Sequence, residues 1–321
     1  QMKTLPATII DAMTTTQLAR LTSTQISWMG PDGLGVLDAE DFASLSATQI
    51  QGMTTTEGQS LSTTQLNALT STQIAALTSA QVKALTVDEL NGLNAGQLKG
   101  FSSTQIFYLQ ASQIGQVTTT FINTLNDSQW MAISATALRA MSNDQVESLS
   151  AARVGMITVT QIRGLAETQL DALSSVQAAA LTETQISALT VTQIKGLDTS
   201  LLTGLSATQI GALTPVQLYA LTDRQVYSLT ETDLGLLRTD QIKGLSLMAV
   251  QSLNTTQFLA LGSTQLNALT VTQIKGLTAF DIAVMTTTQL AGISSTQIAG
   301  MATSQISELS PALIGNLTVT Q

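Results

Sequence analysis

Apolar and polar positions along the chain repeat every eight residues, and the register is never interrupted. Every eighth residue from Leu5 to Leu317 is apolar, and a second apolar position lies five residues later, broken only at Gly58 and Ala178. The unit can be written apolar, Ser/Thr, any, Thr, Gln, apolar, any, small, as residues 69–76 show. A short fixed period over the whole length predicts a repeat architecture.

Neither a long helix nor a flat strand fits this spacing. In an uninterrupted α-helix, eight residues advance about 800°, so each octad would turn its apolar pair by roughly 80° and the pairs would soon cover every side. In a strand, two positions five apart point to opposite faces. A short helix that restarts in every octad fits better.

The polar tripeptide of each octad is typical of a helix start. With Thr70 as N-cap, Gln73 falls at N3 and completes a capping box, while Leu69 and Ile74 form a hydrophobic staple. Pro31, Pro215 and Pro311 are expected at N1, where the missing N–H costs nothing. Acidic residues are expected at N2, near the positive end of the helix dipole: Asp32, Glu40, Asp88, Asp144 and Asp240. The small last residue lets neighbouring backbones approach closely.

Such short helices need neighbours, because isolated helices below about 12 residues are marginal in water. We therefore predict an all-α solenoid of very short capped helices, one per octad, with positions one and six lining the core. Residues 1–321 are expected to form a single continuous solenoid. A β-solenoid remains the alternative, since Thr, Val and Ile are good strand formers.

Composition argues against several function classes. The chain has no His and no Cys, so Ser-His-Asp and Cys-His nucleophiles and the usual zinc sites are excluded, and we expect neither an enzyme nor a cofactor. The net charge of −9 leaves no basic stripe for nucleic acid. Apolar residues never run long enough to span a membrane.

The Gly-rich octad 29–36 predicts a local kink, or alternatively a Ca²⁺ loop, although EF-hand spacing is absent. The acidic residues that would seed this loop are Asp32, Asp38, Glu40 and Asp41.

The rare aromatic residues are the candidates for a contact surface. Several of them, and one methionine, occupy octad positions that are normally polar or small, where exposed rings would anchor another chain or a polysaccharide. Local repacking around an oversized core residue is the alternative. The candidate residues are Phe107, Tyr108, Phe121, Met131, Tyr219 and Tyr227.

Residues 69–76, 189–196 and 269–276 resemble the octapeptide arrays of very large secreted bacterial repeat proteins, which are described as adhesin-like or cell-surface proteins. The resemblance implies an extracellular, structural role. We expect a rod or fibre that self-associates into a filament or continues into neighbouring repeats of a longer chain, because Gln1 and Gln321 both fall in mid-repeat. The alternative is a solenoid that binds a peptide or glycan through its outward aromatic residues.

Overall fold

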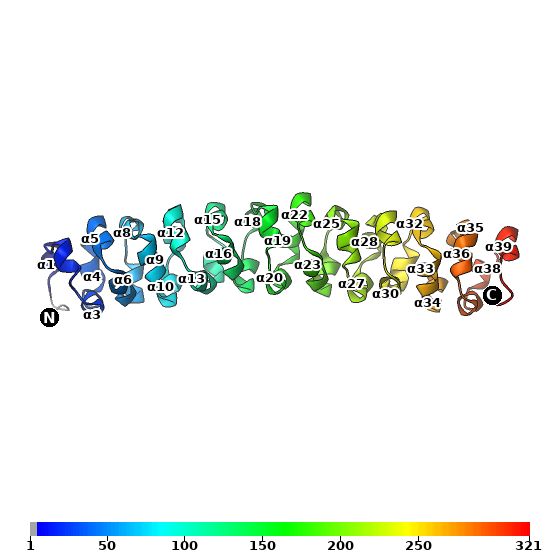
Figure 1. Ribbon diagram of the computed structural model, residues 1–321, viewed down its shortest axis with the longest axis horizontal. Coiled ribbons are helices and arrows are strands. Elements are labelled where there is room, and N and C mark those ends of the chain that lie inside the picture. The colour runs from blue at the N-terminus through cyan, green and yellow to red at the C-terminus, as the bar shows by residue number, and fades with distance from the viewer. Residues whose placement is uncertain (1–4) are drawn as a thin grey trace. The chain divides into compact units, whose positions relative to one another are not determined.

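The computed structural model describes residues 5–321, and every regular element in that range is a short helix (Figure 1). Each complete octad from residue 5 to residue 316 contains one helix, from α1 to α39. No strand occurs in the described residues. The predicted all-α solenoid is confirmed, and the β-solenoid alternative is wrong.

The helices belong to two compact units, Gln1–Leu149 and Ser150–Gln321. The first unit contains α1 (Ala7–Asp11), α2 (Thr15–Leu18), α3 (Ser23–Ile26), α4 (Gly30–Gly35), α5 (Ala39–Ser44), α6 (Ala47–Gly52), α7 (Thr55–Gln59), α8 (Thr63–Ala68), α9 (Ser71–Ala76), α10 (Ser79–Ala84), α11 (Val87–Gly92), α12 (Ala95–Gly100), α13 (Ser103–Tyr108), α14 (Ala111–Ile114), α15 (Thr119–Thr124), α16 (Asp127–Ala132), α17 (Ala135–Arg139) and α18 (Asn143–Glu147). The second contains α19 (Ala151–Gly155), α20 (Val159–Gly164), α21 (Glu167–Asp171), α22 (Ser175–Ala179), α23 (Glu183–Ala188), α24 (Val191–Gly196), α25 (Thr199–Gly204), α26 (Ala207–Gly211), α27 (Pro215–Ala220), α28 (Asp223–Ser228), α29 (Glu231–Gly235), α30 (Thr239–Gly244), α31 (Leu247–Gln251), α32 (Thr255–Ala260), α33 (Ser263–Ala268), α34 (Val271–Gly276), α35 (Ala279–Val284), α36 (Thr287–Gly292), α37 (Ser295–Ala299), α38 (Thr303–Ile306) and α39 (Pro311–Gly315).

Helix α9 shows how one octad starts and stops its helix. The Gln73 N–H donates to Thr70 Oγ1 over 3.3 Å, and the Thr70 N–H donates to Gln73 Oε1 over 2.7 Å, which is the expected capping box. At the other end, Leu77 has φ −56° and ψ 132°, so the backbone leaves the helical region after six residues. The next N-cap residue follows at once, so every helix remains short.

Helix α4 departs from the expected frame. Pro215 and Pro311 begin their helices as predicted, but α4 begins at Gly30, so Pro31 is its second residue and Asp32 its third. The predicted positions of these two residues are wrong. Gly33 replaces the usual glutamine, so this octad has no capping box. Gly30 has φ 70°, a left-handed conformation that glycine adopts without a steric penalty.

The glutamine at position five does more than cap its helix, because its carboxamide also binds the preceding turn. Gln193 is 4% exposed, and its Nε2 donates to the carbonyl oxygens of Ile162 and Leu165, each over 2.8 Å. The first acceptor lies 31 residues earlier and the second 28 residues earlier. Both ends of the carboxamide are therefore used, since its oxygen accepts the N-cap N–H.

This bond recurs through both units, and we call it the glutamine ladder. In the first unit its members are Gln49, Gln65, Gln73, Gln81, Gln97, Gln105, Gln113, Gln129 and Gln145. In the second they include Gln185, Gln193, Gln209, Gln217, Gln225, Gln241, Gln257, Gln265, Gln273, Gln289, Gln297, Gln305 and Gln321. Each donates to the carbonyl 28 residues earlier. One superhelical turn thus takes between three and four octads, and most helices pack against the third helix along the chain.

The core lies inside this ladder. Leu69 is 2% exposed and Ile74 is fully buried, and positions one and six are buried in the same way through most of both units. Each fully buried aliphatic side chain contributes roughly 1.5–3 kcal/mol. Two such residues per octad, together with the ladder, compensate for the weakness of each isolated helix.

The small residue at position eight is required where helices of successive turns touch. A Cβ atom at Gly100 would lie 2.6 Å from the carbonyl oxygen of Ser71, whereas a Cβ at Gly92, in the preceding octad, would meet nothing within 4 Å. We expect Gly100→Ala to lower the free energy of unfolding by about 1 kcal/mol through overpacking. Gly92→Ala is the matched control and should raise it by about 0.5–1 kcal/mol, because alanine favours the helix. Urea denaturation measures the free energy of unfolding of both variants. A change in the same direction for both would contradict the argument that only Gly100 lies against the preceding turn.

Candidate interaction surface

One cluster of exposed aromatic rings lies in the first unit. Phe107 is 55% exposed and packs edge-on against Tyr108, with ring centroids 5.6 Å apart and an interplanar angle of 77°. Lys83 Nζ lies 4.8 Å from the Tyr108 ring centroid, within cation–π range. Met131 is also exposed, on α16, which packs beside α13. Three helices of successive turns thus present Lys83, Phe107 and Met131 at the same octad position.

Phe121 corrects the prediction. It is 2% exposed and is therefore not part of an outward surface. Its octad position was assigned to the outside because it normally carries glutamine. The structure shows that this glutamine is itself buried, so an apolar residue there joins the core, as Ala137 and Leu201 also do.

A second exposed ring, Tyr219, stands between two hollows of the second unit. The ring is 67% exposed. One hollow of about 510 Å³ is bordered by Tyr219, Val191 and Met248, and one of about 320 Å³ by Tyr219, Val216 and Lys243. Lys195 also lines the larger hollow. The helices that carry these residues, α24, α27, α30 and α31, include the stacked pairs α24–α27 and α27–α30.

Sequence reasoning missed Val216 and Met248, which are 65% and 62% exposed. Both occupy position four of their octads, where Thr is usual. An apolar residue at this normally hydroxylated position was the available signal. Tyr227 was predicted to be outward and is 62% exposed on α28, but it lines neither of the two hollows beside Tyr219.

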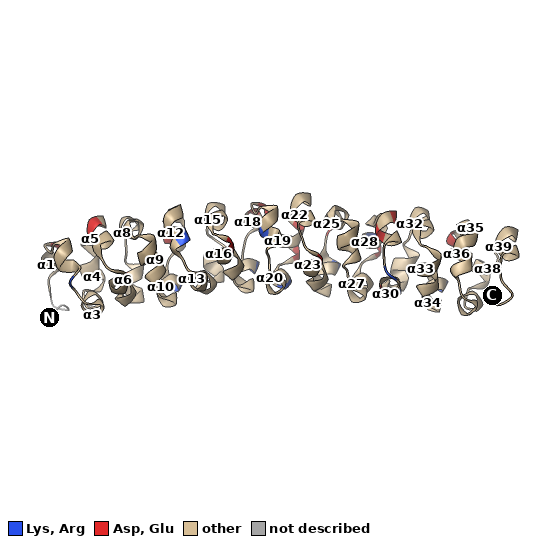
Figure 2. Ribbon diagram, viewed as in Figure 1, with Lys and Arg blue, Asp and Glu red and all other residues tan. Residues whose placement is uncertain are grey.

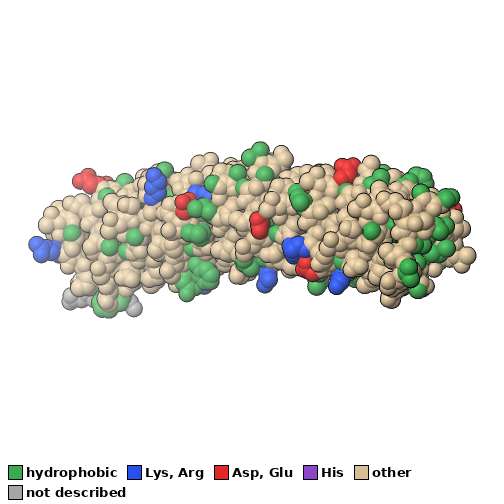
Figure 3. All heavy atoms as spheres, turned by 45° about the vertical axis from the view of Figure 1, so that its right-hand side comes forward, with side chains coloured by type: hydrophobic (Ala, Val, Ile, Leu, Met, Phe, Trp, Pro, Cys, Tyr) green, Lys and Arg blue, Asp and Glu red, His purple; other side chains and the backbone are tan. Residues whose placement is uncertain are grey.

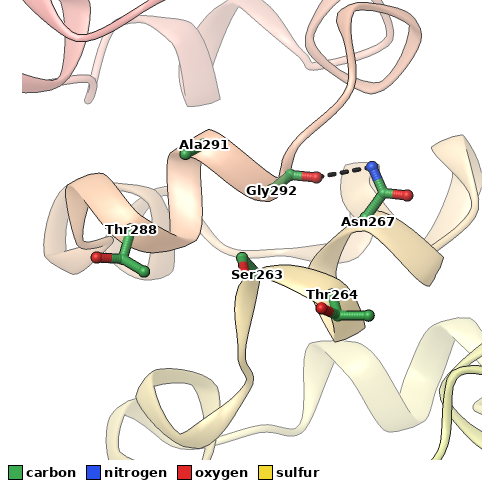
Figure 4. Close-up of a pocket in the computed structure, with 6 residues that line it drawn as sticks. All are labelled: Ser263, Thr264, Asn267, Thr288, Ala291 and Gly292. Atoms are coloured by element: carbon green, nitrogen blue, oxygen red, sulfur yellow. Dashed lines mark hydrogen bonds between the residues drawn. The ribbon is translucent and has the colours of Figure 1, made fainter.

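A polar hollow of about 380 Å³ lies between α33 and α36 (Figure 4). Asn267 Nδ2 donates to the carbonyl oxygen of Gly292 over 2.8 Å and so joins the two turns. Ser263, Thr264 and Thr288 also line this hollow. The hydroxyl groups and the bridging amide give it a chemistry quite different from that of the apolar hollows beside Tyr219.

A fourth hollow, of about 180 Å³, brings together Asp171, Asp198, Lys195 and Arg224. Asp198 caps α25, and its own N–H donates to Asp171 Oδ1 over 2.8 Å. Burial raises the pKa of Asp171 above its ordinary 3.8, with repulsion from Asp198 and Glu167 adding to the effect. The Ser200 backbone N–H bound to Asp198 lowers the pKa of that exposed carboxyl group below 3.8.

These opposite shifts predict a pH effect for Asp171→Asn. Because the folded-state pKa of Asp171 is raised, its contribution to stability is fully present below pH 3.8 and is lost as the pH rises through the folded value. Asparagine keeps the acceptor for the Asp198 N–H without the charge. We expect the variant to be more stable than wild type near neutral pH, with the difference shrinking toward about pH 3. Urea midpoints across this range measure it, and a difference independent of pH would contradict the assignment.

Charged side chains are few and scattered over both units, with acidic and basic residues interspersed (Figures 2 and 3). Arg238 and Asp240 form an exposed ion pair at 3.3 Å. No group of three or more acidic residues within residues 5–321 is arranged to hold a metal ion. Asp38, a residue of the suggested Ca²⁺ loop, instead caps α5 by accepting the Asp41 N–H over 2.9 Å.

None of the helices in the described range is long and apolar enough to cross a membrane. The regular octads, with one short helix in each, identify the chain as a repeat protein. Residues 59–87 match the ALTTAQ repeat family, and this segment includes α8, α9 and α10. A comparison with curated proteins gives no match.

Proposed function

We propose that this repeat protein is a structural element, a rod or fibre of the bacterial cell surface or extracellular matrix, whose role is adhesion or self-assembly. The observation that supports the proposal is the glutamine ladder. The same carboxamide hydrogen bond joins an octad to the preceding turn throughout both units, so a repeated interaction of the chain serves to stack one turn on the next.

The ladder suits a protein that bears load along its repeats. Separating two turns at Gln193 breaks two hydrogen bonds, each worth about 0.5–1.5 kcal/mol net. It also exposes part of the aliphatic core, at roughly 1.5–3 kcal/mol for each side chain fully released. Because most octads repeat these contacts, resistance is distributed over many equivalent links, and length is set by repeat number.

A length series tests the structural role. One ladder bond spans 28 residues, so seven octads contain two such spans. Variants lacking residues 69–124, or carrying a second copy of them, therefore preserve the register of the ladder. Small-angle X-ray scattering should give a maximum dimension that changes by equal steps across the series. A dimension that grows only as the cube root of chain length would contradict a rod.

Self-assembly and location need separate measurements. Negative-stain electron microscopy of the purified chain should show filaments if it is a fibre former, and short single particles otherwise.

For location, protease treatment of intact source cells should remove the repeat epitopes while a cytoplasmic marker stays intact. Protection of the repeats until the cells are lysed would contradict a surface location.

A second candidate function is a binding module for a peptide or glycan. The observation that favours it is Tyr219, an exposed ring with a hollow on either side. A structural rod requires no such feature, because other octads of the second unit have small or polar residues at position seven, such as Gly211 and Asn267. Binding and structural roles are compatible in one solenoid, since its turns expose side chains that the core does not use.

A further inference from the structure

We propose that the surface around Tyr219 binds an extended acidic peptide segment that carries apolar side chains. We define this surface, the Tyr219 groove, by Tyr219, Val191, Val216, Met248, Lys195 and Lys243. The inference rests on the binding role given above as the second candidate and assigns it a site and a ligand class.

The apolar lining determines what enters the hollows. The larger hollow has hydroxyl groups at Thr222 and Ser246, but Val191, Val216 and Met248 offer no hydrogen-bonding group. The hydroxyl groups of a sugar placed against these three side chains would lose water without gaining partners. An apolar side chain has no such penalty and recovers roughly 25 cal/mol per Å² of apolar surface buried. The lining therefore favours a peptide with apolar anchors over a glycan.

The charge around the groove indicates an acidic ligand. Lys195 on α24 and Lys243 on α30 occupy position seven of their octads. These two helices pack on either side of α27, which carries Tyr219. Neither lysine forms an ion pair with another described residue. Asp223 also lines the larger hollow, so the side chains that line the two hollows carry one net positive charge, in a chain whose net charge is −9. Lys195 also borders the separate hollow of Asp171, Asp198 and Arg224. Carboxylates on the ligand would pair with the two lysines.

The spacing of the hollows constrains the peptide. Packed helices are about 8–10 Å apart, and an extended chain rises about 3.3 Å per residue. A ligand that crosses α27 from one hollow to the other therefore needs apolar side chains two to four residues apart. Tyr219, which borders both hollows, would pack against the peptide between these two anchors.

Selection from a display library of random 12-residue peptides tests the proposal, with the full chain as bait. The variant Lys195→Gln/Tyr219→Ser/Lys243→Gln serves for counter-selection. Lys275→Gln/Tyr227→Ser is the matched control, because both residues are outward at position seven and line neither hollow. Circular dichroism establishes that both variants are folded, which is expected because all the changed side chains are exposed.

The expected result is a set of peptides with at least two carboxylates and two apolar residues at the stated spacing. Fluorescence anisotropy should show about tenfold or weaker binding to the groove variant, unchanged binding to the control variant, and weakening as salt is raised. Basic or hydroxyl-rich motifs, equal binding to the groove variant, or no enriched peptide would overturn the proposal. Groove-dependent binding of polygalacturonate, or groove-dependent dimerisation in sedimentation, without peptide binding would also overturn it. None of these outcomes affects the length-series test of the structural role.

Discussion

Replacing Gln193 by methionine is expected to lower the free energy of unfolding of its turn by about 3 kcal/mol. Methionine keeps the volume and helix propensity of the side chain but has no amide. The carbonyl of Leu165 and the N–H of Thr190 then lose their partners in a site where the side chain is 4% exposed. A buried polar group left unpaired costs about 1–3 kcal/mol. Ile162 O still accepts the Leu165 N–H, so its loss is smaller.

The matched control is Gln17→Met in the first unit. Gln17 forms the same capping box with Thr14, but its carboxamide is exposed and its Nε2 donates to no other described residue. This variant should cost only about 1 kcal/mol, the usual value of a cap. Amide hydrogen exchange measures both variants locally, with faster exchange expected in residues 162–165 and 190–197 for Gln193→Met. Equal effects of the two substitutions would show that capping alone explains the conserved spacing of glutamine within the octad.

The capping half of the glutamine's role could be predicted, because it is a local interaction. Thr70 and Gln73 are three residues apart, and the geometry of a helix start places their side chains on each other's N–H groups. The bonds of the ladder instead join residues that are 28 or 31 positions apart in the sequence. Which carbonyl groups accept them depends on how many octads complete a turn. Octad spacing alone does not determine that number, since the bends between helices set it.

For the candidate surface, too, the sequence predicts what the octad determines locally but not what depends on contacts between turns. Phe107, Tyr219 and Tyr227 are exposed because position seven points away from the core wherever the octad is regular. The octad pattern misplaces Phe121, because the polar residue that is usual at its position suggests exposure, whereas Gln129 at the same position of the next octad is 1% exposed. The hollows beside Tyr219 depend on side chains from different turns, so they too required the superhelical geometry.

Two natural exceptions to the ladder lead to predictions of opposite sign. Glu89 and Glu57 both replace the glutamine, and both are buried, at 5% and 1% exposed. Each carboxylate accepts the N-cap N–H of its own helix, as glutamine would. A carboxylate cannot donate, so neither residue can bind the carbonyls of the preceding turn.

We expect Glu89→Gln to raise the free energy of unfolding by about 1–2 kcal/mol. The new amide would stand where the ladder donates to residues 28 and 31 positions earlier, which are Leu61 and Gly58. The Leu61 carbonyl would gain a donor, and a buried charge would be removed. Urea denaturation at neutral pH measures the change. A lower free energy of unfolding would mean that the attraction between the Glu89 carboxylate and the helix dipole contributes more to stability than the new hydrogen bond to the Leu61 carbonyl.

Glu57→Gln should instead lower the free energy of unfolding, by about 1–2 kcal/mol. Here the preceding turn has adapted to the carboxylate. Gly30, with φ 70°, directs its N–H at Glu57 Oε1 over 3.1 Å, while Thr54 donates to Oε2. Glutamine has a single oxygen for these two donors, so its NH₂ group would face an N–H and leave it unpaired. The same substitution at equivalent positions is thus expected to stabilise one turn and destabilise the other, because the backbone of the preceding turn presents a carbonyl in one case and an N–H in the other.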